Sequence, residues 1–350
     1  MTGRKITTSR DVARLAGVSQ ASVSRAFTPG ARLSPELRER VRKAAEALDY
    51  IPNSIASSLT RARTNTVALI IGDTDNPFYI HVLRAFIKAL SARGQQALTF
   101  TVPPGATSDD AIRQVLKFRV DGIILTSAQV SSRMVSLCAG RGIPIILFNR
   151  YIPGANLPVV RCDNFGGGQL IADLLLAAGA RSFALVRGDP LGTTSQDRAG
   201  GFLSRLQGLP VRTLEGGSTY AAALESFGTA YQAGAALPDA VFAVNDIMAM
   251  AVIDVLRFRL GRHVPNEVMV AGFDNLPESA RLPYQLTTLD QPVDEMVAEA
   301  LVVLNQQQAG GNTPAASPSE RPAVERLVPG KLVWRATLRG ARPYSAACAG

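Results

Sequence analysis

The sequence predicts a small all-α head domain followed by a larger α/β body made of two doubly wound units in series. Residues 7–50 contain three short amphipathic segments with helical spacing, bounded by serine, glycine and proline. From Val67 onward, short apolar runs alternate with helical segments, which is the pattern of buried parallel strands joined by crossover helices. With 350 residues, the chain is long enough for two or three domains.

The predicted boundaries follow these changes of pattern. We expect the head and a connecting segment at residues 1–64, with a short helix near 53–60, then the body at 65–340 and a tail at 341–350. The body is expected to divide into one unit at about 65–160 plus 290–325 and a second unit at about 161–289 plus 326–340.

Positive charge is concentrated in the head. Residues 1–64 hold twelve Lys and Arg against five Asp and Glu, a net charge of +7, whereas the whole chain carries +9. A basic head on a nearly neutral body indicates that the head alone binds a polyanion. A solvated basic face on an ordinary helical bundle is the alternative.

Three helices are predicted in the head. Ser9 is the expected N-cap of a helix that runs to about Ala16, Gly17 supplies the turn, and Ser19 caps the second helix. The third begins in "SPELRERVRKAAEAL", where a capping serine precedes a proline at the first helical position. The expected shared core is Val12, Ala16, Val18, Val23 and Phe27, closed by Leu37, Val41, Ala44 and Leu48 of the third helix.

The second helix, in "AGVSQASVSRAF", presents a face of small and polar side chains that adds little to helix stability. Such a face suits insertion into the major groove of DNA. There Gln20 and Arg25 can read base edges, and Ala21 can contact a thymine methyl group. The neighbouring hydroxyls that can contact phosphates are Ser19, Ser22 and Ser24. A generic three-helix bundle with a polar exterior is the alternative.

The connecting segment "YIPNSIASSLTRARTNT" contains a possible helix, capped by Asn53, that is too short to be stable alone in water. We therefore expect it to be coil in the free protein and helical only against a partner. An ordinary polar linker with Leu59 packed onto the body is the alternative.

In the body, strands are predicted in "TVALII", "QALTFTV", "VDGIIL" and "PIILFN" for the first unit, and in "SFALVRG", "PVRTL", "AVFAVND" and "EVMVAGFDN" for the second. We expect residues 286–304 to supply a return strand and a helix packed on the first unit. Residues 306–325 are predicted to be a loop, and residues 331–339 to form a last strand of the second unit.

Polar and aromatic residues follow the predicted strands. In folds of this kind ligands lie between the halves, beyond the carboxyl ends of the strands. The residues expected at this cleft are Asp75, Asn76, Phe78, Tyr79, Ser127, Asn149, Arg150, Arg187, Asn245 and Asp274, with Arg198 near the start of a helix. A carboxylate, amides and a guanidinium beside an aromatic ring suit a polyol ring, and the arginines suggest an acidic or phosphorylated sugar. Loop caps and surface pairs are the alternative for each residue.

The sequence contains no motif that would indicate an enzyme, a metalloprotein or a nucleotide-binding protein. Cys138, Cys162 and Cys348 follow no metal or disulfide spacing, and the two histidines lie in no ligand motif. The glycine run at 166–168 lacks the third glycine of a dinucleotide loop and the lysine of a phosphate loop. No catalytic residue, cofactor or metal is therefore expected. Without an apolar run long enough to span a membrane or a signal-peptide core, a cytoplasmic, nucleoid-associated protein is expected.

The stretch "TSRDVARLAGVSQASVSRAF…LSPELRERVRKAAEALDYIPNSIASSL" resembles the helix-turn-helix headpiece of the LacI/GalR family of transcriptional regulators over residues 7–60. The resemblance implies operator contacts from Thr8, Ser9, Ser19, Gln20, Ala21, Ser22, Ser24 and Arg25. It also implies a hinge helix in the minor groove, with Asn53, Ala56 and the apolar wedge Leu59.

The body, from about 65 to 340, is similar to a periplasmic-binding-protein-like sensor domain of the same family. This resemblance implies that Arg198 contacts a small effector and that Asn245 and Asp274 bond its hydroxyl groups. It implies a homodimeric regulator, expected to be a repressor, that binds a near-palindromic DNA operator and a sugar-like effector. No leucine heptad of a tetramer-forming tail follows Trp334. A solute-binding protein for uptake, or an α/β enzyme, would share only the body.

Overall fold

The computed structural model describes residues 7–28, 30–51, 64–72, 76–103, 106–126, 129–232, 235–310 and 324–340. The predicted hinge helix near 53–60, with Asn53, Ala56 and Leu59, and the predicted tail at 341–350 lie outside the described residues. The chain divides into two compact units, Met1–Thr64 and Asn65–Gly350.

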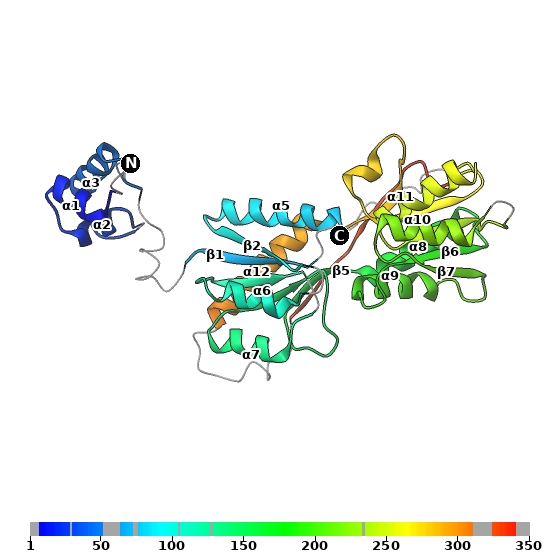
Figure 1. Ribbon diagram of the computed structural model, residues 1–350, viewed down its shortest axis with the longest axis horizontal. Helices are drawn as coiled ribbons and strands as arrows, with labels where there is room; N and C mark the ends of the chain where they lie inside the picture. The colour runs from blue at the N-terminus through cyan, green and yellow to red at the C-terminus, as the bar shows by residue number, and fades with distance from the viewer. Residues whose placement is uncertain are drawn as a thin grey trace, which may run out of the picture. The chain divides into compact units, whose positions relative to one another are not determined.

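The described part of the first unit contains helices α1 (Ser9–Ala16), α2 (Gln20–Ala26) and α3 (Pro35–Ala47) (Figure 1). The N-cap of α1 is Thr8, not Ser9. The Thr8 N–H and hydroxyl both donate to the Asp11 carboxylate, at 3.0 and 2.7 Å. Thr8 is followed three residues later by a carboxylate, as a capping box requires, whereas Ser9 is followed there by Val12.

The three helices share one small apolar core. Val12, Val23 and Val41, one from each helix, are buried in it. Arg38 of α3 donates to the carbonyl oxygens of Ala26 and Ala31, at 2.7 and 2.8 Å, and so satisfies the end of α2. The opposite side of α2 is exposed to solvent, with Gln20, Ala21, Ser24 and Arg25.

The second unit contains two six-stranded sheets. In the first sheet, ordered β11-β5-β4-β3-β1-β2, all neighbouring strands are parallel. Its strands are β1 (Thr66–Ile71), β2 (Gln96–Thr101), β3 (Gly122–Leu125), β4 (Ile145–Phe148), β5 (Val159–Cys162) and β11 (Glu325–Val328).

Helices α5 (Pro77–Ala92) and α12 (Val293–Gly310) cover one face of this sheet, and α6 (Ser108–Val115) and α7 (Ser132–Gly140) cover the other (Figure 1). Alternating side chains of β1 explain the two layers, because Leu69 packs with the first pair of helices and Ile70 with the second. We call this sheet and its helices the N-subdomain.

The second sheet has the order β12-β10-β9-β8-β6-β7, with only the β10–β12 pair antiparallel. Its strands are β6 (Phe183–Arg187), β7 (Val211–Glu215), β8 (Ala240–Ala243), β9 (Met269–Asp274), β10 (Thr287–Asp290) and β12 (Lys331–Val333). Its helices are α8 (Asn164–Ala177), α9 (Thr193–Ser204), α10 (Tyr220–Ala230) and α11 (Asp246–Asp254), with the π-helical turn η1 (Val255–Arg259) and the 3-10 turn η2 (Pro277–Ala280). We call this sheet and its helices the C-subdomain.

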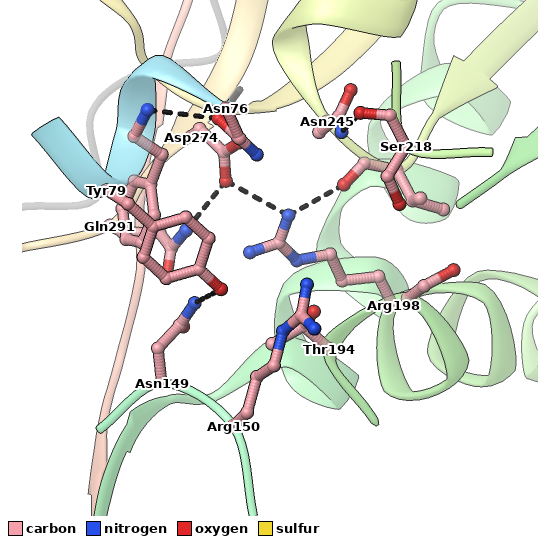
Figure 2. Close-up of a pocket in the computed structure, with 13 residues that line it drawn as sticks. Asn76, Tyr79, Asn149, Arg150, Thr194, Arg198, Ser218, Asn245, Asp274 and Gln291 are labelled. Carbon is pink, nitrogen blue, oxygen red and sulfur yellow. Dashed lines mark hydrogen bonds and ion pairs between the residues drawn. The ribbon is translucent and has the colours of Figure 1, made fainter. Parts of the chain in front are cut away.

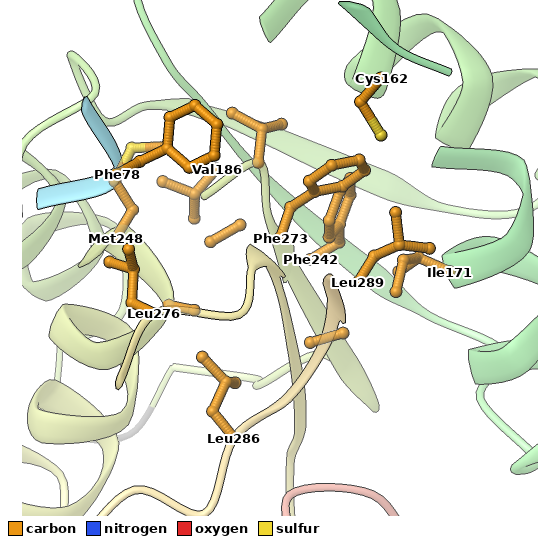
Figure 3. Close-up of a cluster of buried hydrophobic side chains, with 14 of the residues drawn as sticks. Phe78, Cys162, Ile171, Val186, Phe242, Met248, Phe273, Leu276, Leu286 and Leu289 are labelled. Carbon is orange, nitrogen blue, oxygen red and sulfur yellow. The ribbon is translucent and has the colours of Figure 1, made fainter. Parts of the chain in front are cut away.

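Successive residues of β9 place two helices on opposite faces of the second sheet. Phe273 lies against Gly167 of α8, whereas Gly272 lies against Asp246 and Ala249 of α11. Figure 3 shows Phe273 beside Phe242 and Leu289 in the apolar cluster on the α8 side. The glycine run at 166–168 also lets α8 approach α9, since a Cβ on Gly168 would overlap the backbone of Arg198.

The predictions for the return strand and for the borders of the two units were partly wrong. The return strand β10 pairs with β9 in the second sheet, in agreement with the predicted border at 289/290 but not with the expected packing of residues 286–304 on the first unit; only the helix α12 that follows packs on the N-subdomain. The predicted border at 325/326 cuts through β11, which pairs with β5 and belongs wholly to the first sheet. The border at 160/161 likewise falls inside β5. The crossing points are therefore shifted by a few residues from the predicted ones.

Candidate functional site

A pocket lies between the two subdomains, at the carboxyl ends of their strands (Figure 2). Both subdomains contribute residues to the walls of the pocket. These walls are formed by Asn76, Phe78, Tyr79, Asn149, Arg150, Thr194, Ser195, Arg198, Ser218, Val244, Asn245, Asp274 and Gln291. The parallel strands of both sheets end here, which is where open α/β sheets place ligands.

Most of the residues predicted for the cleft line this pocket: Asn76, Phe78, Tyr79, Asn149, Arg150, Arg198, Asn245 and Asp274. Asp75 and Ser127 lie outside the described residues. Arg187 is not among the lining residues. It ends β6, and its guanidinium lies 3.8 Å from the carboxylate of Glu215 at the end of the neighbouring strand β7.

Five lining residues were not predicted: Thr194, Ser195, Ser218, Val244 and Gln291. Gln291 directly follows β10, and it lies just beyond the predicted border at 289/290. Thr194 and Ser195 lie in the first turn of α9, where their closeness to Arg198 was an available signal. Ser218 lies in the loop after β7 and has a φ of 63°, a left-handed conformation that the sequence did not indicate.

Arg198 and Asp274 form the charged centre of the pocket, and both are buried. Arg198 Nη1 donates to Asp274 Oδ1 at 3.0 Å and to the carbonyl oxygen of Val244 at 2.7 Å. Its Nε donates to Asn164 Oδ1 at 2.8 Å, and the guanidinium lies 3.7 Å from the Phe273 ring centroid. Because these four contacts fix the guanidinium, it faces a ligand in a single orientation.

Asp274 is held in an uncommon backbone conformation, with a φ of 125°. Gln291 Nε2 donates to the same Oδ1 atom at 2.6 Å. Burial raises the pKa of Asp274 above its usual value, while Arg198 and Gln291 oppose this by stabilising the carboxylate. A buried carboxylate compensated by a guanidinium leaves this part of the pocket close to neutral.

A second carboxylate, Asp246, lies at the first position of α11 and is fully buried. It accepts hydrogen bonds from the hydroxyl of Thr288 and from the Leu276 N–H, the latter at 2.8 Å. Burial and the nearby charge of Asp274 raise the pKa of Asp246 to about 7. Through Leu276, Asp246 fixes the loop that follows Asp274.

Two buried acceptor atoms that line the pocket have no hydrogen-bond partner among the described residues, Asn149 Oδ1 and Gln291 Oε1. The amide of Asn149 donates to the Tyr79 hydroxyl at 3.3 Å, which aims the side chain into the pocket (Figure 2). Unsatisfied buried acceptors are costly, and a ligand that carries hydroxyl donors would satisfy them.

Phe78 and Tyr79, from the first turn of α5, supply the apolar wall of the pocket. Their rings meet edge to face, with centroids 5.4 Å apart, and both side chains are buried. Asn76 caps α5, because its Oδ1 accepts from the Phe78 N–H at 3.0 Å. Asn245 caps α11 in the same way, through Met248 at 2.9 Å.

Beside the pocket, a polar network joins the two subdomains. Arg161 of β5 donates from Nη1 to Asp197 of α9 at 2.8 Å and from Nε to Glu325 of β11 at 2.7 Å. The Tyr151 hydroxyl also donates to Asp197, at 3.1 Å. We call Tyr151, Arg161 and Asp197 the latch. Burial raises the pKa of Asp197, and Arg161 acts against this rise.

In the described part of the first unit, several residues predicted to contact DNA lie on α2 or at its start. Ser19 caps α2, since its hydroxyl accepts from the Ser22 N–H at 3.2 Å, and the two serine hydroxyls lie 3.0 Å apart. Gln20 Nε2 donates to Ser9 Oγ at 2.8 Å. Exposed small polar groups beside Arg25 are compatible with a groove-binding surface.

In the described residues, no cluster of three or more His, Cys, Asp or Glu side chains is arranged to hold a metal ion. None of the described helices combines the length and the apolar composition needed to cross a membrane.

Comparison with known proteins identifies both parts of the chain. Residues 8–53 match the family described as bacterial regulatory proteins, lacI family, and residues 172–338 match the periplasmic binding protein-like domain. The HTH-type transcriptional regulator CelR of Thermobifida fusca is 31% identical over 331 residues, covering 89% of this chain and 95% of that protein. The HTH-type transcriptional regulator DegA of Bacillus subtilis (strain 168) is 34% identical, covering 84% and 89%.

Among solved structures, the transcriptional regulator CelR–cellobiose complex is similar to this chain. It is 27% identical, with a TM-score of 0.66, and the match covers 95% of this chain and 99% of that one. The predicted fold class, a helix-turn-helix headpiece joined to a periplasmic-binding-protein-like body of two α/β subdomains, is confirmed.

Proposed function

Because this chain belongs to the lacI family of bacterial regulatory proteins, we propose that it is a transcriptional repressor whose operator affinity is set by a small sugar-like effector bound between its subdomains. The headpiece contacts operator DNA in this proposal, and the body acts as the sensor. As a DNA-binding regulator it has no catalytic residues and works in the cytoplasm.

The composition of the pocket carries the effector part of this proposal. Its acceptors Asn149 Oδ1 and Gln291 Oε1 suit hydroxyl donors, and the rings of Phe78 and Tyr79 suit the C–H face of a sugar. Arg198 is already compensated by Asp274, and Arg187 lies outside the pocket. Arg198 and Arg187 therefore give no support for an acidic or phosphorylated sugar, Arg150 is the remaining arginine at the pocket, and a neutral sugar is the proposed ligand. The CelR–cellobiose complex supports the same ligand class.

The exposed face of α2 carries the DNA part of the proposal, with Gln20, Ala21 and Arg25 facing solvent. Thr8, Ser9, Ser19, Ser22 and Ser24 are proposed as further operator contacts, and Asn53, Ala56 and Leu59 as contacts of a hinge helix. A homodimer would place two α2 helices one turn of DNA apart, roughly 34 Å, and so select a near-palindromic operator.

The DNA-binding part is tested by in vitro selection. Full-length protein is incubated with a duplex library that contains a randomised central segment, and bound duplexes are sequenced after several rounds. We expect enrichment of a near-palindromic motif, with affinity that falls steeply as salt rises because counterions are released. A sugar-binding protein that enriches no motif at low salt would instead be a solute-binding protein, the alternative that its relatives do not favour.

The effector part is tested by thermal shift with a panel of neutral sugars, sugar acids and sugar phosphates. A ligand at a hundred times its Kd stabilises the folded protein by about 2.7 kcal/mol, and we expect a neutral sugar to do so. Asp274→Ala is expected to abolish the shift while the protein stays folded, and Glu215→Ala, outside the pocket, is expected to retain it. An undiminished shift for Asp274→Ala would remove this residue from the site.

A further inference from the structure

Two residues of the headpiece, on different helices, meet through their side chains. Gln20 is the first residue of α2 and Ser9 the first residue of α1. Gln20 Nε2 donates to Ser9 Oγ at 2.8 Å. Because Gln20 is exposed, water competes for this bond, and it adds little to the stability of the headpiece. Its effect is conformational, since a free glutamine side chain samples many rotamers.

Ser9 is itself held in place by the residue before it. The N–H and the hydroxyl of Thr8 both donate to the carboxylate of Asp11, at 3.0 and 2.7 Å, which fixes the backbone at the start of α1. The support for Gln20 is therefore a rigid helix end. The second of these bonds also turns the Thr8 hydroxyl toward Asp11.

The Ser9–Gln20 bond leaves one N–H donor and the carbonyl acceptor of Gln20 available to bind a base edge. A glutamine amide has two N–H donors and one carbonyl acceptor. One N–H is used by Ser9, so that the other N–H and Oε1 remain. A donor and an acceptor side by side are what an amide needs to pair with the major-groove edge of adenine. Ser9 accepts in this bond, and its own hydroxyl hydrogen stays available to DNA.

We propose that Ser9 is a positioning residue for base recognition by Gln20, and that the two side chains act as one unit in the operator complex. The inference rests on the proposed DNA-binding function and adds a specificity determinant to it. Discrimination at the base pair read by Gln20 then depends on both residues, whereas the contacts that other headpiece residues make to the DNA backbone do not.

A double-mutant cycle tests this coupling. The probe is the duplex selected by the wild-type full-length protein, together with its single-base-pair variants. Ser9→Ala, Gln20→Ala and the double variant are compared by fluorescence anisotropy at fixed salt. The wild type is expected to prefer the selected base pair, at the position sensitive to Gln20→Ala, by roughly 5- to 150-fold, the range for one bidentate contact. Ser9→Ala is expected to lose most of this preference at that position only, and the double variant to lose no more than Gln20→Ala.

Several controls separate positioning from folding. Ser9→Thr, which keeps the hydroxyl, is expected to restore the preference. Ser34→Ala removes the capping acceptor of α3 without touching Ser9 or Gln20, and it is expected to keep the preference. Alanine is a good helix former at position 9, and circular dichroism checks the fold. If Ser9→Ala does not fold, Ser9→Cys, close in size and a weak acceptor, takes its place.

Three results would overturn the proposal. Unchanged discrimination in Ser9→Ala, or a uniform loss of affinity for all duplexes, would show that Ser9 does not orient Gln20. A loss in the double variant equal to the product of the single losses would show that the two residues act independently. If the wild type selects no duplex at all, the proposed function itself fails, and this outcome is seen before any variant is made.

Discussion

Asp246 is a fully buried carboxyl group with a raised pKa close to the pocket, and it does not itself line the pocket. It is fully buried, and its carboxylate accepts from Thr288 on β10 and from the Leu276 N–H after β9. Its pKa of about 7 lies above the ordinary aspartate value because burial and Asp274 disfavour the charge. Asp246 therefore binds its proton more tightly in the folded protein than in the unfolded chain.

The sign of the resulting pH dependence follows from linkage. A carboxyl group with a raised folded-state pKa contributes stability that is complete below the unfolded pKa and is lost as pH rises through the folded pKa. The free energy of unfolding of the body should thus decrease from about pH 4 to about pH 7. Asp246→Asn mimics the protonated form. It should make the decrease in the free energy of unfolding between pH 4 and pH 7 smaller by roughly a few kcal/mol. Urea unfolding of both proteins at several pH values measures it, and equal slopes would contradict the assignment.

At the scale of elements, α9 connects the pocket to the subdomain interface. Two adjacent residues of this helix face different partners, since Arg198 binds Asp274 in the pocket and Asp197 binds Arg161 and Tyr151 of the N-subdomain. Side-chain exposures of 14% for Arg161 and 18% for Asp197 mean that solvent screens this pair only partly. A ligand enclosed between the subdomains needs the closed arrangement that the latch stabilises.

Removing the latch should weaken effector binding without changing any pocket residue. We expect Arg161→Ala to raise the Kd of the effector by roughly 3- to 30-fold, because the binding-competent state becomes less populated. Isothermal titration calorimetry measures this change. Arg205→Ala breaks an ion pair with Asp173 inside the C-subdomain and serves as the matched control. A Kd unaffected by Arg161→Ala, or raised equally by Arg205→Ala, would rule out the latch.

The sequence predicted elements well where local signals decide them. The helices of the headpiece, the apolar strands and most of the described pocket residues were readable from spacing and caps, whereas the N-cap Thr8 and the position of Arg187 were not. The prediction failed where the structure depends on pairing between strands that are distant in the sequence. The return strand "TTLD" pairs with β9 rather than with the N-subdomain, and no local feature of two threonines and an aspartate specifies that neighbour. Gln291, one of the missed site residues, directly follows this strand. Arg161–Asp197, separated by 36 residues, had no sequence signal.

At the scale of the whole molecule, the proposed homodimer needs an apolar interface. Phe258 of η1 and Leu282 are 81% and 91% exposed. Their segments are neighbours, because the Arg257 guanidinium donates to the carbonyl oxygen of Pro283. Large apolar side chains exposed on neighbouring segments can form a patch, and such patches mark interaction surfaces. We propose that they pair with the same surface of a second copy.

Leu282→Asp should therefore shift the protein from dimer to monomer, since a charge buried in an apolar interface is costly. Sedimentation equilibrium measures the mass, and operator affinity should fall with the loss of the second headpiece. Leu191→Asp is the matched control, because Leu191 is 79% exposed but lies in the loop after β6. Dimers of Leu282→Asp, or monomers of both variants, would exclude this surface as the specific interface.

Coupling between the pocket and the headpiece would make this protein an effector-controlled repressor, and a single titration measures it. Labelled operator duplex, obtained by selection, is titrated with full-length protein in the absence and in the presence of a saturating sugar identified by thermal shift. For a repressor released by its effector, the operator Kd should rise by roughly 5- to 150-fold, the range typical of allosteric coupling. An operator Kd that is the same with and without the bound sugar would show that the pocket and the headpiece are not coupled.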